Sequence, residues 1–80
     1  MKRKPARRPG FVVCIDNRGY EAALEVGKLY RVIPDKDAEA LGYVRVVDES
    51  GEDYGYSKDR FFSLRLPPAL RKTLLAAART

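Results

Sequence analysis

The stretch from Tyr43 to Phe62 constrains the fold most, because it has the pattern of a β-hairpin followed by one more strand. Polar and apolar side chains alternate through YVRVV, and the alternation returns after a turn at Tyr54 and Tyr56. The segment ESGE between the two runs indicates the turn, with Gly51 where a tight hairpin needs positive φ. This stretch predicts an all-β domain.

Alternation and turn residues together predict five strands that close into a small barrel. The expected strands are Phe11–Asp16, Leu29–Ile33, Tyr43–Asp48, Asp53–Ser57 and Phe61–Leu64. The segment before the second strand is expected to carry Leu24 and Val26 on one side and to reverse at Gly27. The polar segment DKDAEALG should form a loop with one helical turn before Gly42.

Eighty residues make one domain whose core is near the lower size limit for folding without disulfides or metal. We expect a disordered basic arm over residues 1–10, the barrel over 11–64 and a helical extension over 65–80. The arm is expected to be disordered because it has no apolar periodicity to offset its ordering entropy.

The helix of the extension is expected over 69–79, with Pro68 as its first residue and Leu70, Leu74 and Ala77 or Ala78 on one apolar stripe. The first strand is apolar on both faces, so one face needs a cover. The helix could dock there, around Val12 and Cys14 or Val13 and Ile15. A helix that enters a partner's groove and a frayed tail are the alternatives.

The net charge of +5 conceals a division between the ends and the middle of the chain. Eleven acids and seven bases lie between Phe11 and Leu64, a balance of −4, whereas the two ends carry nine bases and no acid. Those bases are Lys2, Arg3, Lys4, Arg7, Arg8, Arg65, Arg71, Lys72 and Arg79. A basic isoelectric point therefore points to nucleic acid only for the ends.

Several classes of protein are disfavoured by composition. No run approaches the roughly twenty apolar residues of a membrane span, and the basic N-terminus lacks the apolar core of a secretory signal, so we expect a cytoplasmic protein. The chain has one cysteine and no histidine, which disfavours a metal cluster and leaves Cys14 as a small buried hydrophobe rather than a nucleophile. No phosphate loop or carboxylate pair points to catalysis, so we expect no enzyme activity and no cofactor.

Several short motifs resemble a known architecture. The order of the expected elements is similar to that of the Src-homology-3-like barrel. A long loop follows the first strand, LEVGK then leads into a strand, and a loop, a hairpin and a short closing strand follow. The chain also resembles a set of small uncharacterised bacterial and phage proteins in its short motifs. These motifs are CIDN with GYE, then Leu24, GK and Tyr30, and later Asp48, GEDY and RF. The resemblance covers about residues 11–64 and implies the barrel, with no activity attached.

The chain departs from the peptide-binding form of that barrel. That form builds its groove from tyrosines, a tryptophan and a proline, whereas this chain has no tryptophan, and SKDR stands where the proline is expected. A cluster of tyrosines remains as the candidate protein-binding site: Tyr20, Tyr43, Tyr54 and Tyr56. The alternative is that these are ordinary half-buried strand residues with their hydroxyl groups in water.

Two functions follow from these patterns. In the first, the domain is a protein-interaction module whose acidic loops and tyrosines receive a basic or proline-containing segment of a partner protein. In the second, the protein binds nucleic acid weakly and without sequence preference through its basic ends. The candidate contacts of the N-terminal arm are Lys2, Arg3, Lys4, Arg7 and Arg8, while the acids Asp48, Glu49, Glu52 and Asp53 are expected to edge the groove and repel a phosphate backbone.

Overall fold

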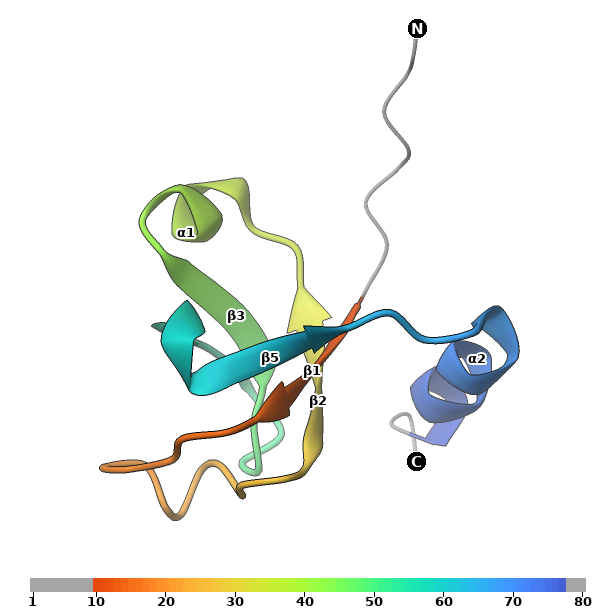
Figure 1. The fold of residues 1–80 in the computed structure, drawn as a ribbon, viewed down its shortest axis with the longest axis horizontal. Helices are drawn as coiled ribbons and strands as arrows, with labels where there is room; N and C mark the ends of the chain where they lie inside the picture. Colours follow the sequence, from red (N-terminus) through yellow and green to blue (C-terminus); the bar gives the residue numbers. More distant parts are fainter. Residues whose placement is uncertain (1–9, 78–80) are drawn as a thin grey trace, which may run out of the picture.

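The computed structural model describes residues 10–77, so nearly all of the proposed basic arm and the last expected helical positions lie outside the described residues. The strands are β1 (Phe11–Cys14), β2 (Leu29–Ile33), β3 (Tyr43–Val47), β4 (Asp53–Ser57) and β5 (Phe61–Leu64). The helical elements are α1 (Lys36–Ala40), the short 3-10 helix η1 (Lys58–Arg60) and α2 (Pro68–Ala77) (Figure 1). All five expected strands are confirmed, with β1 and β3 ending slightly earlier than the pattern predicted.

The five strands form one antiparallel sheet in the order β4-β3-β2-β1-β5. Val12 of β1 is in register with Tyr30 of β2 and with Ser63 of β5. Within residues 10–77, β4 and β5 form the two borders and do not pair with each other, so the sheet is open. The mainly β prediction is confirmed, and closure of the sheet is not observed.

The core lies on the inner face of the curved sheet. Apart from Phe11, which is buried on the outer face, the buried residues of the strands lie on the inner face because side chains alternate along a strand. They are Val12, Cys14, Tyr30, Val46, Tyr56 and Phe61, joined by Leu24 from the loop after β1. The rings of Tyr56 and Phe61 are 6.1 Å apart, which brings the inner faces of β4 and β5 together although the strands are not paired.

The loop over residues 15–28 covers one end of this core chiefly through Leu24, which is fully buried, with Ala23 packed beside it. Two hydrogen bonds within the loop fix Leu24: its amide donates to the Tyr20 carbonyl, and the Asn17 side chain donates to its carbonyl, both at 2.9 Å. The Glu49 amide ties the loop to the hairpin by donating to the Ala23 carbonyl at 2.9 Å. Val26 is 54% exposed, so the prediction that Leu24 and Val26 share one side is wrong. The loop is a series of turns rather than an extended strand, and strand alternation does not apply to it.

Two predicted turns are confirmed. Gly51 has a φ of +88°, the left-handed conformation that the β3–β4 hairpin requires. The helical turn before Gly42 is α1, which begins after Asp35, whose carboxylate accepts a hydrogen bond from the Ala38 amide at 3.1 Å. Both turns follow directly from local residue types.

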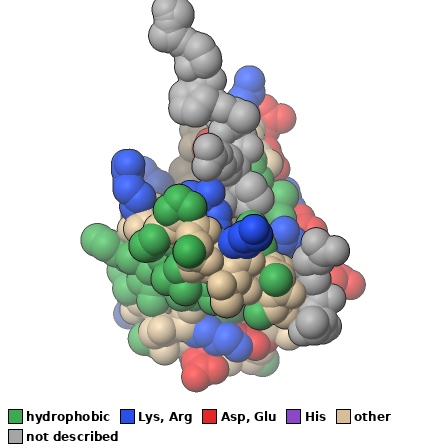
Figure 2. All heavy atoms as spheres, turned by 90° about the vertical axis from the view of Figure 1, so that its right-hand side faces the viewer, with side chains coloured by type: hydrophobic (Ala, Val, Ile, Leu, Met, Phe, Trp, Pro, Cys, Tyr) green, Lys and Arg blue, Asp and Glu red, His purple; other side chains and the backbone are tan. Residues whose placement is uncertain are grey.

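Helix α2 lies beside the outer face of the sheet, and none of its described residues is buried. The space between them is a groove of about 890 Å³, lined by Phe11, Leu29 and Arg31 from the sheet side and by Leu74 and Ala77 from α2. Figure 2 views the molecule from the α2 side and shows hydrophobic side chains gathered on this face.

The prediction that the helix covers β1 is wrong as stated. Val12 and Cys14 point into the core, where a helix on the outer face cannot reach them. On the outer side Ile15 is 54% exposed and Phe62, the neighbour of Val13 in β5, is 62% exposed. Phe11, on the outer face of β1 beside the groove, is buried, whereas Ile15 and Phe62 are left uncovered by the helix.

Candidate protein-binding surface

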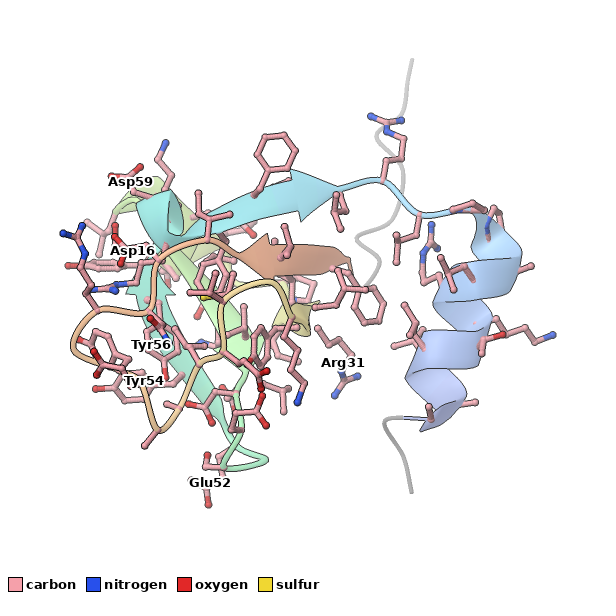
Figure 3. All side chains as sticks on the ribbon, turned by 60° about the horizontal axis from the view of Figure 1, so that its bottom comes forward. Asp16, Arg31, Glu52, Tyr54, Tyr56 and Asp59 are labelled. Carbon is pink, nitrogen blue, oxygen red and sulfur yellow. The ribbon has the colours of Figure 1, made fainter. Side chains whose placement is uncertain are left out.

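Three of the four candidate tyrosines meet on the inner-face side of the sheet. The ring of Tyr56 lies 5.0 Å from that of Tyr20, edge to face, and 5.1 Å from that of Tyr54. Tyr20 comes from the loop after β1, whereas Tyr54 and Tyr56 are alternate residues of β4 (Figure 3). We call these three residues the tyrosine surface.

Tyr56 anchors the tyrosine surface. It is 3% exposed, and its hydroxyl donates to Asp48 Oδ2 at 2.7 Å, so this hydroxyl is bonded within the protein rather than to water. Burial, followed by the nearby Asp48 carboxylate, raises the pKa of Tyr56 well above its ordinary value. Tyr56 is therefore a fixed, neutral platform that holds its two neighbours in place.

The outer two tyrosines present their rings to solvent. Tyr20 is 40% exposed and packs edge to face against Tyr56, and Tyr54 is 55% exposed and packs against Tyr56 with its ring tilted. Half-exposed tyrosines on a rigid base supply large contact area at a low cost in conformational entropy, which suits them to bind another protein.

Tyr43 lies elsewhere, and its inclusion in the cluster is wrong. It is in register with Ser57 on the outer face of β3 and β4, whereas Tyr54 and Tyr56 face the other way. Its neighbours around a shallow hollow include Asp35, Leu41 and Arg45. The cause is strand alternation, since Tyr43 is an odd number of residues from the buried Val46 of the same strand.

Arg60 extends the tyrosine surface on the side of η1. Its guanidinium lies 4.7 Å from the centre of the Tyr20 ring, within the range of a cation–π contact. It also donates to the backbone carbonyl of Asp16 at 3.1 Å and lies 3.6 Å from the Asp16 carboxylate. This arginine fixes the loop after β1 to the start of β5 and holds Tyr20 in place.

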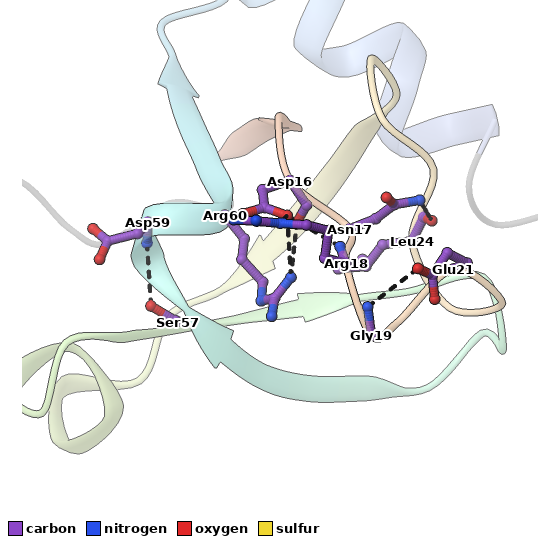
Figure 4. A network of polar contacts seen from close by, with 9 residues as sticks. All are labelled: Asp16, Asn17, Arg18, Gly19, Glu21, Leu24, Ser57, Asp59 and Arg60. Carbon is purple, nitrogen blue, oxygen red and sulfur yellow. Dashed lines mark hydrogen bonds and ion pairs between the residues drawn. The ribbon is translucent and has the colours of Figure 1, made fainter.

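Asp16 is the centre of the polar network shown in Figure 4. Its carboxylate accepts two hydrogen bonds from the Arg18 guanidinium, at 2.8 and 3.0 Å. Hydrogen bonds from the Arg18 side chain and amide, with a smaller contribution from the charge of Arg60, hold the pKa of Asp16 far below its usual value. Asp16 therefore stays ionised at neutral pH and keeps the loop closed on Arg60.

Sequence reasoning missed the roles of Asp16 and Arg60. They are 44 residues apart: Asp16 ends the first expected strand, and Arg60 comes just before the last one. The DNRG segment does carry the signal of a turn closed by its own aspartate, but no local pattern points from Asp16 to Arg60.

The acids of the β3–β4 hairpin do not edge the tyrosine surface as a group. All four line the groove beside α2, and only Asp48 also touches a member of the tyrosine surface. Three of them are already bonded: Asp48 to Tyr56, Glu49 to Lys28 and Tyr30, and Asp53 to Arg45. Asp53 and Tyr54 are consecutive residues of β4, so their side chains point to opposite faces of the sheet.

The Glu49 carboxylate joins the hairpin to the loop after β1. It accepts from the Tyr30 hydroxyl at 2.6 Å and pairs with Lys28 at 2.7 Å. Bonds from Lys28 and then Tyr30 lower the pKa of Glu49, while burial and then the Glu49 carboxylate raise the pKa of Tyr30. This acid thus has a structural role rather than one in binding.

Neither the basic residues of the N-terminal arm nor comparisons with known proteins assign a function to the chain. Lys2, Arg3, Lys4, Arg7 and Arg8 lie outside the described residues. Over residues 10–77 no group of acids and cysteine is arranged to hold a metal ion, and no helix has the length and apolarity to cross a membrane. No family model, curated protein or solved structure matches the chain.

Proposed function

We propose that this chain is a small non-enzymatic protein-interaction module, which receives a segment of a partner protein on the surface formed by Tyr20, Tyr54 and Tyr56. The observation that carries this proposal is the arrangement of two exposed tyrosine rings around a third, buried one whose hydroxyl is fixed by Asp48. Rigid aromatic side chains of this kind are enriched at the centres of protein interfaces.

We further propose that the open sheet is a Src-homology-3-like barrel. Three features support this architecture: the strand order β4-β3-β2-β1-β5, the long loop between β1 and β2, and η1 between β4 and β5. The contact between Tyr56 and Phe61 brings the two sheet borders together on the core side. The long loop and η1 meet at the tyrosine surface, where the Arg60 guanidinium lies over the Tyr20 ring.

The chemistry of the surface favours a segment with proline and basic residues. Exposed tyrosine rings accept proline rings and the flat face of arginine guanidinium groups. The loop that carries Tyr20 also carries Glu21 and Glu25, both exposed and without an ion pair to another described residue. These carboxylates attract a cationic segment to the rings beside them.

The test is a binding assay with a peptide library that combines proline with arginine or lysine. We expect Tyr20→Ala and Tyr54→Ala each to weaken binding of the selected peptide by on the order of tenfold or more, the loss typical of an aromatic interface centre. Tyr43→Ala is the matched control, because Tyr43 is 48% exposed but lies on the other face. Equal losses in all three variants, or no binding by any peptide, would overturn the proposal.

A further inference from the structure

The border formed by β5 is open to another strand. Among the described residues its one neighbour in the sheet is β1. The Ile15 amide donates to the Arg60 carbonyl at 2.8 Å, and Val13 is in register with Phe62. Since hydrogen-bonding directions alternate along a strand, the backbone groups of Phe61 and Ser63 point away from β1 to the free border.

The β5 border lacks the usual protection against strand pairing. Natural edge strands carry charges, prolines or bulges that prevent association. The FFSL segment of β5 contains no charged residue and no proline. The opposite border, β4, begins with Asp53 and is interrupted by Gly55. On the outer face β5 exposes 62% of Phe62, which α2 leaves uncovered.

The two ends of β5 carry opposite charges. Asp59 precedes the strand and Arg65 follows it; both are exposed, and neither forms an ion pair with another residue in the range 10–77. Arg60 is different, because it is half-buried and bonded to Asp16. Figure 3 shows Asp59 beside the start of β5, with the linker to α2 leaving the other end.

We propose that β5 pairs antiparallel with β5 of a second copy of this chain, about a two-fold axis through Ser63. In this register Ser63 faces Ser63 of the second copy, and the outward backbone groups of Phe61 face those of Arg65. Phe62 then lies opposite Leu64 on the outer face, where both side chains are apolar. Asp59 of each copy falls opposite Pro67 of the other and diagonal to Arg65, within reach of the long arginine side chain, so a second copy is a strand whose charges match this border at both ends.

The first test removes one backbone donor. Ser63→Pro deletes an amide that points away from β1, a position where an edge strand tolerates proline. We expect the unmodified protein to change from one chain to two with rising concentration in sedimentation equilibrium. Ser63→Pro should remain a single chain at every concentration while keeping its far-ultraviolet circular dichroism.

The second test uses charges and leaves the backbone unchanged. Asp59→Lys and Arg65→Asp should each weaken self-association by on the order of tenfold, because each variant puts like charges together at both ends of the pairing. An equimolar mixture of the two variants should associate as well as the unmodified protein, since a mixed pair brings opposite charges together again at both ends of the two strands. Lys36→Asp, in α1, makes the same change in net charge as Arg65→Asp but away from β5, and is the control.

Three results would overturn the proposal. The unmodified protein could remain a single chain up to millimolar concentration, Lys36→Asp could weaken association as much as Arg65→Asp, or the mixture could associate no better than either variant alone. Because the mixture compares two folded proteins with unchanged β5 backbones, its result decides the register even if Ser63→Pro fails to fold.

Discussion

Tyr56 connects the core of the domain to its candidate binding surface. Its ring packs against Phe61 inside the sheet and against Tyr20 and Tyr54 toward solvent, and its hydroxyl is bonded to Asp48. Burial acts to raise the pKa of Asp48, but hydrogen bonds from Ser50 and Tyr56 outweigh it, so this pKa is lowered overall. A neutral tyrosine and an ionised aspartate thus stabilise each other at neutral pH.

The raised pKa of Tyr56 gives a prediction for stability at alkaline pH. An unfolded tyrosine loses its proton near pH 10.0, whereas the folded Tyr56 keeps it there, so the folded state binds more protons and stability falls as pH rises above that value. Thermal unfolding followed from neutral pH to above pH 10 should show this fall. In Tyr56→Phe the fall should be shallower, with Tyr30 still contributing in the same direction. Identical slopes in the two proteins would show that Tyr56 is not the group responsible.

At the scale of elements, the positions of the strands were predictable from the sequence, whereas the side-chain contacts that join distant segments were not. Alternation located β2, β4 and β5 at their observed bounds, because each is a short run of strand-forming residues between strong turn signals. The position of Tyr43 on the outer face was predictable in principle from the same alternation. The ties of Asp16 to Arg60 and of Tyr30 to Glu49 were not, since they join segments that only the folded sheet brings together.

Helix α2 is predicted to contribute little to the stability of the sheet. Leu74 lines an open groove and stays partly exposed, so Leu74→Asp should lower the free energy of unfolding by only about 1 kcal/mol or less, as for surface sites. Leu24→Ala, at a fully buried side chain, should cost about 2–5 kcal/mol. Urea denaturation measures both values. A cost for Leu74→Asp as large as that for Leu24→Ala would place α2 in the cooperative core.

At the scale of the whole molecule, the division of charge separates two kinds of binding. The segment from Phe11 to Leu64 has a balance of −4, and several of its bases are already paired with acids: Arg18 with Asp16, Lys28 with Glu49, and Arg45 with Asp35 and Asp53. The cations of this segment are therefore poorly placed to contact phosphate. Any attraction to nucleic acid would come from the ends of the chain.

This division predicts how nucleic-acid binding would depend on salt. Binding of the full chain to duplex DNA should be weak, without sequence preference, and should fall with salt at a slope of about −0.9 for each phosphate contacted. Removal of residues 1–9, which contain five bases, should flatten that slope. Fluorescence titrations of labelled DNA and RNA at two salt concentrations provide the comparison. A truncated protein that bound as tightly as the full chain would contradict the assignment of this binding to the ends.

The proposed protein-binding role of the tyrosine surface is tested most directly by nuclear magnetic resonance. An isotope-labelled sample of the full chain would be titrated with a peptide of proline and arginine, and the amide shifts followed residue by residue. We predict that the largest shifts fall on Tyr20, Tyr54 and Arg60, with Tyr43 and Leu41 unchanged. Shifts centred on Tyr43 and Leu41, or on the groove between Arg31 and α2, would contradict this role.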